Sequence, residues 1–243
     1  ASILIEVGNK EKDVFFFDLG AGALRNFTGL KLPLNSASKV FVTHLHTDHV
    51  GDMPALVWSL GKSGRNVPVE LWGPSGATKE LGTQSYAKHL MLAHAWDTEA
   101  MKENPSKSGA KIIATEFPYD KPTKIYERNG VVISSFPVKH MIAGPVGLRL
   151  DYNGRSIVYS GDTTPTDSLQ LASKGGVDLL IHETFPDAAT FAKKAGWPIE
   201  LAKVQLSYLH TSPAMAGKIF KQAGARMSVI FHLAVDHETV GSV

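Results

Sequence analysis

The sequence of 243 residues contains no cysteine. This absence excludes thiol catalysis, thiolate-ligated metals, iron–sulfur clusters and disulfide bonds. It does not identify a compartment, because a chain of this length can bury a large core in an oxidising or a reducing environment. We therefore expect a soluble protein that is either cytoplasmic, or periplasmic or secreted after removal of a signal segment.

The net charge is small, and the sequence has no long apolar run. The 25 Lys and Arg residues against 23 Asp and Glu residues give a formal charge of +2, which disfavours an extended nucleic-acid surface and an acidic disordered tail. No apolar run approaches the roughly 18 residues of a membrane span, so we expect no membrane partner. With 43% hydrophobic residues and no low-complexity linker, the sequence predicts one domain over residues 1–243.

Short apolar and β-branched runs bounded by turn residues predict strands, and longer segments with helical spacing predict helices between them. This alternation indicates an α/β fold. The expected strands are Ile3–Val7, Val14–Asp18, Lys39–Val42, Val69–Trp72, Lys111–Phe117, Val131–Val138, Gly147–Tyr152, Ser156–Ser160, Asp178–Ile181 and a buried strand at Ser228–Phe231. The expected helices are Met53–Leu60, about Thr78–Ala95, about Thr166–Ser173 and Pro213–Ala223.

The sequence contains ten histidines, and three of them, His44, His46 and His49, lie within six positions. Asp48 lies between His46 and His49. In a strand that turns into a loop, alternate residues share a face, so His44 and His46 can approach one cation. A tight turn can then bring Asp48 and His49 to a second cation. Imidazole and carboxylate ligands suit Zn²⁺ and also admit Fe or Mn. The alternative, a histidine-rich surface loop, is disfavoured by this density.

One such cluster cannot complete two metal shells, so further ligands are expected at other strand ends. His140, Asp162 and His232 each follow a predicted strand, where open α/β sheets place their sites. Taken alone, each could equally be a capping or core polar residue. His237 is a second candidate near His232, and the place at the strand end favours His232.

Several segments form a recognisable pattern in a fixed order along the chain. The first is the His-x-His-x-Asp-His run from His44 to His49. The others are Phe136–His140, Gly147–Leu150, Tyr159–Thr163, Leu180–Phe185 and His210–Pro213. On these segments the chain resembles the metallo-β-lactamase fold superfamily, and in particular its ribonuclease Z-like branch.

The resemblance implies a four-layer αβ/βα sandwich with a binuclear site at one edge of its two sheets. It further implies two divalent metal ions, zinc or in its place manganese or iron, that share a hydroxide able to attack the substrate. Asp48 would also orient this hydroxide. The implied ligands are His44, His46 and His140 for one metal, Asp48, His49 and His232 for the other, and Asp162 as the bridge between them.

The resemblance also assigns a proton donor. His210 precedes a predicted helix, and its imidazole would protonate the leaving group. Glu183 would pair with His210 and orient it, whereas His182 would have a structural role. The alternative for His210 is a helix-start histidine that bonds only to the backbone.

The chain departs from ribonuclease Z at the place of the substrate arm. A tRNA-processing ribonuclease Z of that branch carries a long Gly/Pro-rich arm there, with which it grips tRNA. Here the gap Leu150–Ser160 holds only a hairpin turned by Asn153-Gly154. Together with the low net charge, this disfavours nucleic acid as a partner. About residues 61–130 are instead expected to form a cap or insertion over the site. Gly73–Gly76 and Tyr126–Gly130 resemble the arylsulfatase-like subgroup of the branch.

The main hypothesis is therefore a binuclear metal-dependent hydrolase of small esters, with sulfate or phosphodiester esters as substrates. The alternatives within the enzyme class are β-lactam or lactone hydrolysis and ribonuclease Z-like phosphodiester cleavage. A non-catalytic metal-binding module is the alternative from a different class, and the presence of all seven expected ligands argues against it. The expected partner is a small-molecule ester, and the sequence leaves a homodimer open.

Overall fold

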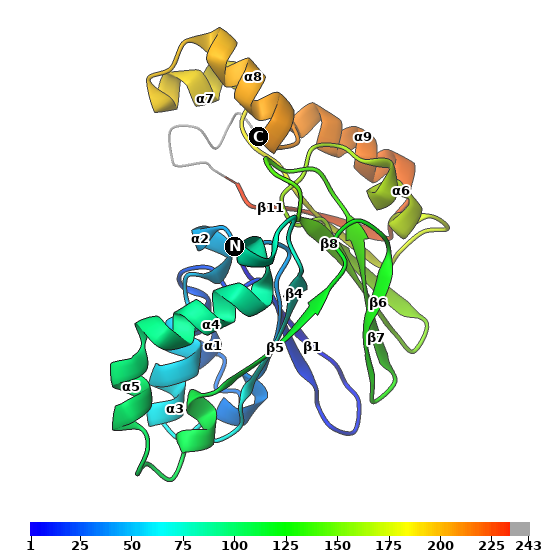
Figure 1. The fold of residues 1–243 in the computed structure, drawn as a ribbon. Helices are drawn as coiled ribbons and strands as arrows, with labels where there is room; N and C mark the ends of the chain where they lie inside the picture. Colours follow the sequence, from blue (N-terminus) through cyan, green and yellow to red (C-terminus); the bar gives the residue numbers. More distant parts are fainter. Residues whose placement is uncertain (234–243) are drawn as a thin grey trace. The chain divides into compact units, whose positions relative to one another are not determined.

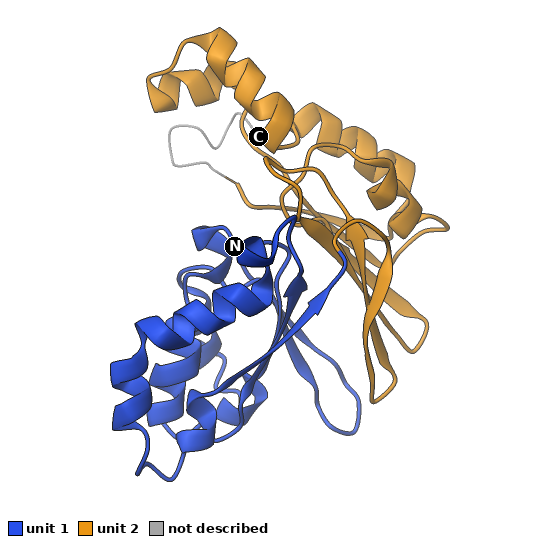
Figure 2. Ribbon diagram, in the orientation of Figure 1, with its two compact units in different colours: residues 1–118 blue, residues 119–243 orange. Residues whose placement is uncertain are grey.

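The computed structural model describes residues 1–233. The chain forms two compact units, residues 1–118 and the residues from 119 onward, each with its own sheet and helices (Figure 2). The predicted α/β class is therefore confirmed. No helix in residues 1–233 is both long and apolar enough to cross a membrane. The single domain over residues 1–243 and the cap at about residues 61–130 stay predictions.

The first unit is built on a five-stranded sheet. Its strands are β1 (Ile3–Glu6), β2 (Val14–Phe17), β3 (Lys39–Phe41), β4 (Val69–Pro74) and β5 (Ile112–Phe117). Its helices are α1 (Ala23–Gly29), α2 (Thr47–Val50), α3 (Leu60–Lys62), α4 (Thr83–Ala93) and α5 (Ala95–Ala100), with the shorter turns η1 (Leu34–Ser36), η3 (Lys79–Leu81) and η4 (Lys107–Ala110) and the π-helix η2 (Ala55–Ser59). The strands follow in chain order across the sheet, with β1 antiparallel to β2 and β2 to β5 parallel. The carboxyl ends of β2, β3 and β4 therefore lie at one edge.

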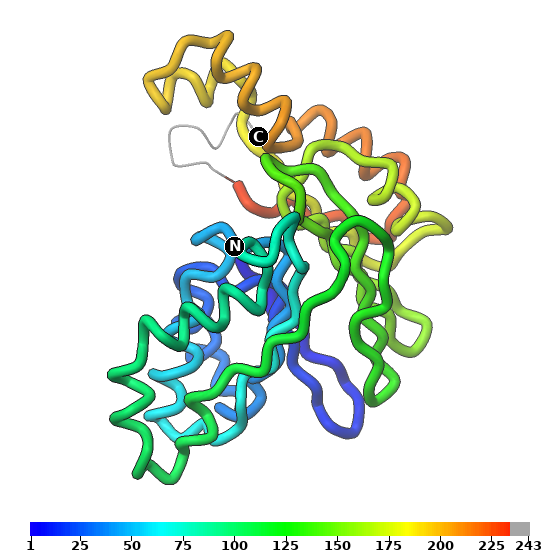
Figure 3. Tube along the Cα trace, in the orientation of Figure 1, coloured from blue at the N-terminus to red at the C-terminus, as the bar shows by residue number. Residues whose placement is uncertain are grey.

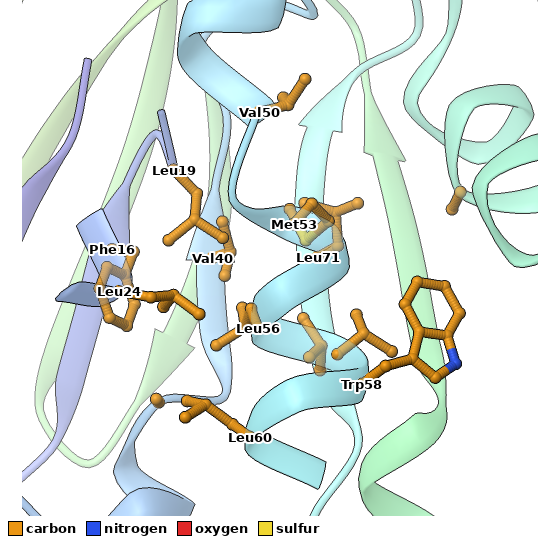
Figure 4. Close-up of a cluster of buried hydrophobic side chains, with 14 of the residues drawn as sticks. Phe16, Leu19, Leu24, Val40, Val50, Met53, Leu56, Trp58, Leu60 and Leu71 are labelled. Atoms are coloured by element: carbon orange, nitrogen blue, oxygen red, sulfur yellow. The ribbon is translucent and has the colours of Figure 1, made fainter. Parts of the chain in front are cut away.

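Helices of the first unit lie over one face of this sheet and enclose a hydrophobic core (Figures 1 and 4). Phe16, Val40 and Leu71 lie opposite one another on three neighbouring strands. Residues in register point to the same face of a sheet, and all three belong to this core. Met53 and Leu56, which follow the histidine motif in the sequence, pack into the same core and are fully buried. The core thus anchors the chain directly after the motif.

A buried arginine stabilises the π-helix that follows the motif. The guanidinium of Arg65 is fully buried and donates to the carbonyl oxygens of Leu56 at 3.1 Å, Val57 at 3.2 Å and Gly109 at 2.5 Å, and also to that of Val67. The guanidinium thus joins the π-helix to the segments around Val67 and Gly109. Burial lowers the pKa of Arg65 to about 10, so the side chain stays charged near neutral pH.

The second unit is built on a six-stranded sheet. Its strands are β6 (Thr123–Arg128), β7 (Val131–Pro137), β8 (Val146–Tyr152), β9 (Arg155–Tyr159), β10 (Leu179–Glu183) and β11 (Met227–Phe231), and its helices are α6 (Asp167–Ser173), α7 (Ala188–Ala195), α8 (Ile199–Leu209) and α9 (Pro213–Ala223). Strands β6 to β9 form an antiparallel meander, and β9, β10 and β11 are parallel. This arrangement places the carboxyl ends of β7, β9, β10 and β11 at one edge.

Helices α6 and α9 pack on the sheet of the second unit. Leu169 of α6 and Ile219 of α9 join Phe136, Val158 and Leu180 of the sheet in one buried cluster. The chain leaves β10, forms α7 and α8, and then enters α9 (Figure 3). The Ser212-Pro213 start and the Gly224 end of α9 are as the sequence predicts.

The structure also departs from the sequence-based expectations. The pattern does not indicate β6, α1, α2, α5, α7 or α8. The strand predicted at Ser228–Phe231 is present as β11, but its predicted burial is wrong, because Val229 is 39% and Ile230 41% exposed. Among the described residues β11 is an edge strand and pairs only with β10, so its apolar composition does not reflect burial on both faces.

Candidate metal centre

The histidine motif of the first unit follows β3. Strand β3 ends at Phe41, and the chain turns through an extended segment into the single-turn helix α2, with His46 as the residue before it. His44 Nε2 lies 2.9 Å from His46 Nδ1, and the rings of His44 and His49 have centroids 4.1 Å apart. Asp48 Oδ2 lies 3.3 Å from His49 Nε2. All four predicted residues of this motif therefore come together within the first unit.

Asp18 holds this cluster and is absent from the sequence-based site. It follows β2 directly, at the edge where β3 also ends, and both its carboxylate and the ring of His49 are fully buried. Its Oδ2 lies 2.8 Å from His49 Nδ1, and its Oδ1 accepts from the Thr43 backbone N–H at 2.7 Å. A carboxylate on Nδ1 places the proton there and leaves Nε2 of His49 as the ligand atom.

Glycine is required where the chain after β2 passes the motif. A Cβ at Gly20 would lie 1.9 Å from the backbone oxygen of Asp48, a distance no side chain can adopt. The neighbouring Leu19 donates its N–H to the His49 oxygen at 2.6 Å. The loops after β2 and β3 are thus joined by backbone contacts as well as by Asp18.

The second unit gathers its candidate ligands at the carboxyl edge of its sheet. His140 follows β7, Asp162 follows β9 and His232 follows β11. Asp162 Oδ2 lies 3.5 Å from His232 Nε2 and 3.9 Å from His140 Nε2. His140 and Asp162 are buried. The carboxylate therefore stands between the two imidazoles, as a shared ligand requires.

The rings of His44 and His140 have defined orientations in their own units. His140 Nδ1 donates to the Leu209 carbonyl oxygen at 2.6 Å, and His44 Nδ1 lies 3.0 Å from the Thr43 hydroxyl oxygen. A ring whose Nδ1 is bonded to the protein presents Nε2 as a ligand, which is the usual arrangement for histidines that bind metals. The donor set of imidazoles and carboxylates, without thiolate, fits divalent zinc, manganese or iron.

Glu183 lies at the end of β10 and contacts His210. Its Oε1 accepts from the backbone N–H of Thr163 at 3.0 Å and of Thr211 at 3.1 Å, and lies 3.2 Å from His210 Nδ1. Burial, and secondly the negative charge of Asp162, raise the pKa of Glu183 well above its usual value. The pairing expected between Glu183 and His210 is present in the structure.

His210 lies close to the ligand set of its own unit. Candidate ligand atoms of His210, His140 and Asp162 lie within 4.8 Å of one another, so His210 is a candidate metal ligand as well as a proton donor. One ring face of His210 stacks on Phe185, with centroids 4.0 Å apart and planes 6° apart. Its orientation is therefore defined by Glu183 on Nδ1 and by Phe185 on the ring.

The structure thus assembles the predicted residues in two groups, one in each unit. The first unit holds His44, His46, Asp48 and His49, and the second holds His140, Asp162, Glu183, His210 and His232. The assignment of these residues to two metals stays a prediction. His237, the weaker alternative to His232, lies outside the described residues.

Comparison with known proteins then identifies the family. A family model described as a beta-lactamase superfamily domain matches residues 16–233. The chain belongs to the metallo-β-lactamase superfamily. This membership confirms the predicted fold and the predicted enzyme class, a hydrolase. It agrees with the histidine and aspartate groups at the two sheet edges.

Among the proteins similar to this chain are members of the ribonuclease Z-like branch. Ribonuclease BN of Proteus mirabilis is 25% identical, with 96% of this chain and 83% of the relative covered. Ribonuclease Z of Mycobacterium avium is 31% identical over 74% of this chain and 62% of the relative. The short form of human tRNase Z has the same fold, with a TM-score of 0.70, 21% identity, and 96% and 85% of the two chains covered. The arylsulfatase-like subgroup stays a prediction.

Proposed function

We propose that this superfamily member is a metal-dependent phosphodiesterase of the ribonuclease Z type. The observation that carries the proposal is the similarity to ribonucleases Z and BN over nearly the whole chain. The paired groups of imidazole and carboxylate ligands at the sheet edges supply matching chemistry. A sulfate ester, the other half of the main sequence-based hypothesis, has no support among these relatives.

The proposed ligand assignment follows the family resemblance and comprises five imidazoles and two carboxylates. When bound, two divalent cations lower the pKa of a water toward neutrality and stabilise negative charge on the phosphate. The proposed ligands are His44, His46 and His140 for one cation, Asp48, His49 and His232 for the other, and Asp162 for both. Zinc is the expected metal, with manganese or iron in its place.

The other proposed roles are proton transfer and the orientation of the attacking water and of the histidine rings. We assign to His210 the donation of a proton to the leaving oxygen as the phosphorus–oxygen bond breaks, while Asp48 orients the attacking water. Glu183 holds Nδ1 of His210, so the proton is transferred from Nε2. Asp18 has the same positioning role toward His49 that Glu183 has toward His210.

Two phosphodiester substrates are candidates, and RNA comes first because the relatives carry ribonuclease names. The expectation that nucleic acid is an unlikely partner is therefore withdrawn. A small phosphodiester is the second candidate, favoured by one observation: β8 and β9 are joined at the Asn153-Gly154 turn, with Tyr152 paired to Arg155. A hairpin this short offers no arm to grip RNA.

The test compares three substrates on one preparation: bis(4-nitrophenyl) phosphate, 4-nitrophenyl sulfate and an RNA with a 3′ extension. The proposal predicts hydrolysis of the phosphodiesters, loss of that activity on chelation and its return with Zn²⁺ or Mn²⁺. In His140→Ala and Asp162→Ala, metal content and activity should both fall. Faster hydrolysis of the sulfate than of either phosphodiester would overturn it. Light scattering on the same sample measures whether the protein is a monomer or a homodimer.

A further inference from the structure

A cavity opens beside His210 in the second unit. It has a volume of about 360 Å³, and its walls include Pro165, Phe185, Leu206 and Met215 together with His210 itself. These walls come from the loop after β9, the loop after β10, helix α8 and the first turn of α9. Every lining residue belongs to the second unit.

The chemistry of the cavity favours a planar apolar group. Apolar atoms form most of its exposed wall, and Thr164, Asp187 and Ser207 line it as well. Lys203, another lining residue, forms an ion pair with Glu200 at 2.8 Å. The volume is at the lower end of small-molecule pockets, which suits a single ring system. Aromatic rings gain most in such a site from contacts with aromatic and thioether side chains.

The position of the cavity relates it to the leaving group. Phe185 lines the cavity and also stacks on His210, and Phe191 packs edge-on against Phe185 with centroids 5.7 Å apart. His210 also faces the ligand group, since its ring centroid lies 5.1 Å from that of His140. A group in the cavity would therefore be next to the proton donor.

We propose that this cavity binds a planar aromatic ring carried by the leaving alcohol, and that Met215 and Leu206 determine this specificity. The inference rests on the proposed function, because the leaving oxygen takes its proton from His210. The ring could be a nucleobase of an RNA product or the aryl group of a small ester, and the same contacts would hold either.

Filling the cavity tests the proposal. Met215→Trp places a large ring in the cavity, Met215→Leu is the conservative variant, and Leu171→Trp adds the same ring at a side chain of α6 that is 68% exposed. Two substrates share a methyl group and differ in the leaving alcohol: methyl 4-nitrophenyl phosphate releases an aryl alcohol, and methyl 2,2,2-trifluoroethyl phosphate an aliphatic one. The ratio of their kcat/KM values isolates recognition of the ring.

The expected result is a fall of about 10- to 100-fold in this ratio for Met215→Trp, the range that stacking of one ring contributes. Met215→Leu and Leu171→Trp should keep the wild-type ratio. An unchanged ratio in Met215→Trp would overturn the proposal, and so would an equal loss on both substrates, which indicates damage to the reaction itself. Comparing the kcat/KM of the wild type for adenylyl-adenosine with that for methyl 4-nitrophenyl phosphate shows whether the cavity prefers a nucleobase or an aryl group.

Equilibrium binding separates this proposal from the proposed function. Adenosine and 4-nitrophenol are titrated separately into wild type and Met215→Trp and followed by NMR. Saturable binding of either probe to wild type, weakened at least about 10-fold in the variant, supports the cavity even if no phosphodiester is hydrolysed. Failure of wild type to bind either probe would overturn the cavity proposal, whatever the activity.

Discussion

Asp18 Oδ2 lies 2.8 Å from His49 Nδ1, and both side chains are fully buried. A carboxylate in this position holds the proton on Nδ1 and raises the basicity of Nε2 toward a cation. Asp18 reaches His49 because β2 and β3 are parallel neighbours whose carboxyl ends share an edge. Its backbone adopts φ 59°, a left-handed conformation that Asp tolerates better than most residues.

The first prediction concerns this contact. Asp18→Asn removes the negative charge while keeping the size of the side chain, so metal affinity should fall roughly 10- to 100-fold. Competition with a chromogenic chelator measures the affinity. Asp120→Asn, at an exposed position, is the matched control. An affinity equal to that of the wild type would show that Asp18 supports the fold alone.

The second prediction separates the two roles open to His210. His210→Ala should keep the metal content of the wild type and slow turnover on the order of 10²- to 10⁴-fold, because a proton donor is lost. The effect should be largest for leaving groups of high pKa, which need the proton most. Metal analysis and a series of leaving groups on one preparation provide both readouts. Loss of a metal in the variant would make His210 a ligand instead.

The third prediction concerns Arg65. Arg65→Met removes the hydrogen bonds from the guanidinium to the carbonyl oxygens of Leu56 and Val57, and a hydrogen bond from a charged donor contributes about 1.5–3 kcal/mol. We expect the free energy of unfolding to fall by about 3 kcal/mol, measured by urea denaturation. Arg25→Met, at an exposed position, should stay within roughly 0.5 kcal/mol of the wild type. A similar small change in Arg65→Met would contradict the assigned role.

The fourth prediction is a pH dependence. Burial lowers the pKa of His182 to about 4, against 6.5 in the unfolded chain. Between these values the unfolded chain binds a proton that the folded chain does not, so the free energy of unfolding falls as the pH drops from 6.5 toward 4. The contribution is at most roughly 3 kcal/mol.

His182→Gln should remove this contribution, so that the difference in stability between wild type and variant changes steadily across that pH window. Urea denaturation at several pH values measures it, with exposed His89→Gln as the control. A constant difference between wild type and His182→Gln would show that His182 does not take part in the acid transition.

Strand ends could be located from the sequence because apolar runs stop at polar residues there. This criterion found Asp162 and His232, and parallel strands then bring such residues to one edge. Asp18 meets the same criterion, as it follows the run Val14–Phe17 directly. It was missed because the expected strand was extended to Asp18, whereas β2 ends at Phe17.

Other features depend on tertiary contacts that a local pattern does not record. The apolar run at Met227–Phe231 predicts a strand correctly but not its exposure at the sheet edge. Helices α7 and α8 flank the Trp197-Pro198 pair, whose proline interrupts the helical pattern. The contact between Glu183 and His210 came from the family resemblance, since 27 positions separate the two residues.

The central claim is that the two ligand groups hold two catalytic metals. It is tested most directly by metal content per chain and hydrolysis of bis(4-nitrophenyl) phosphate, measured together on native, chelator-treated and reconstituted protein. We predict two divalent metals per chain in the active forms, and loss and recovery of activity in step with them. Full activity in the metal-free protein, or two bound metals without hydrolysis of any phosphodiester, would contradict it.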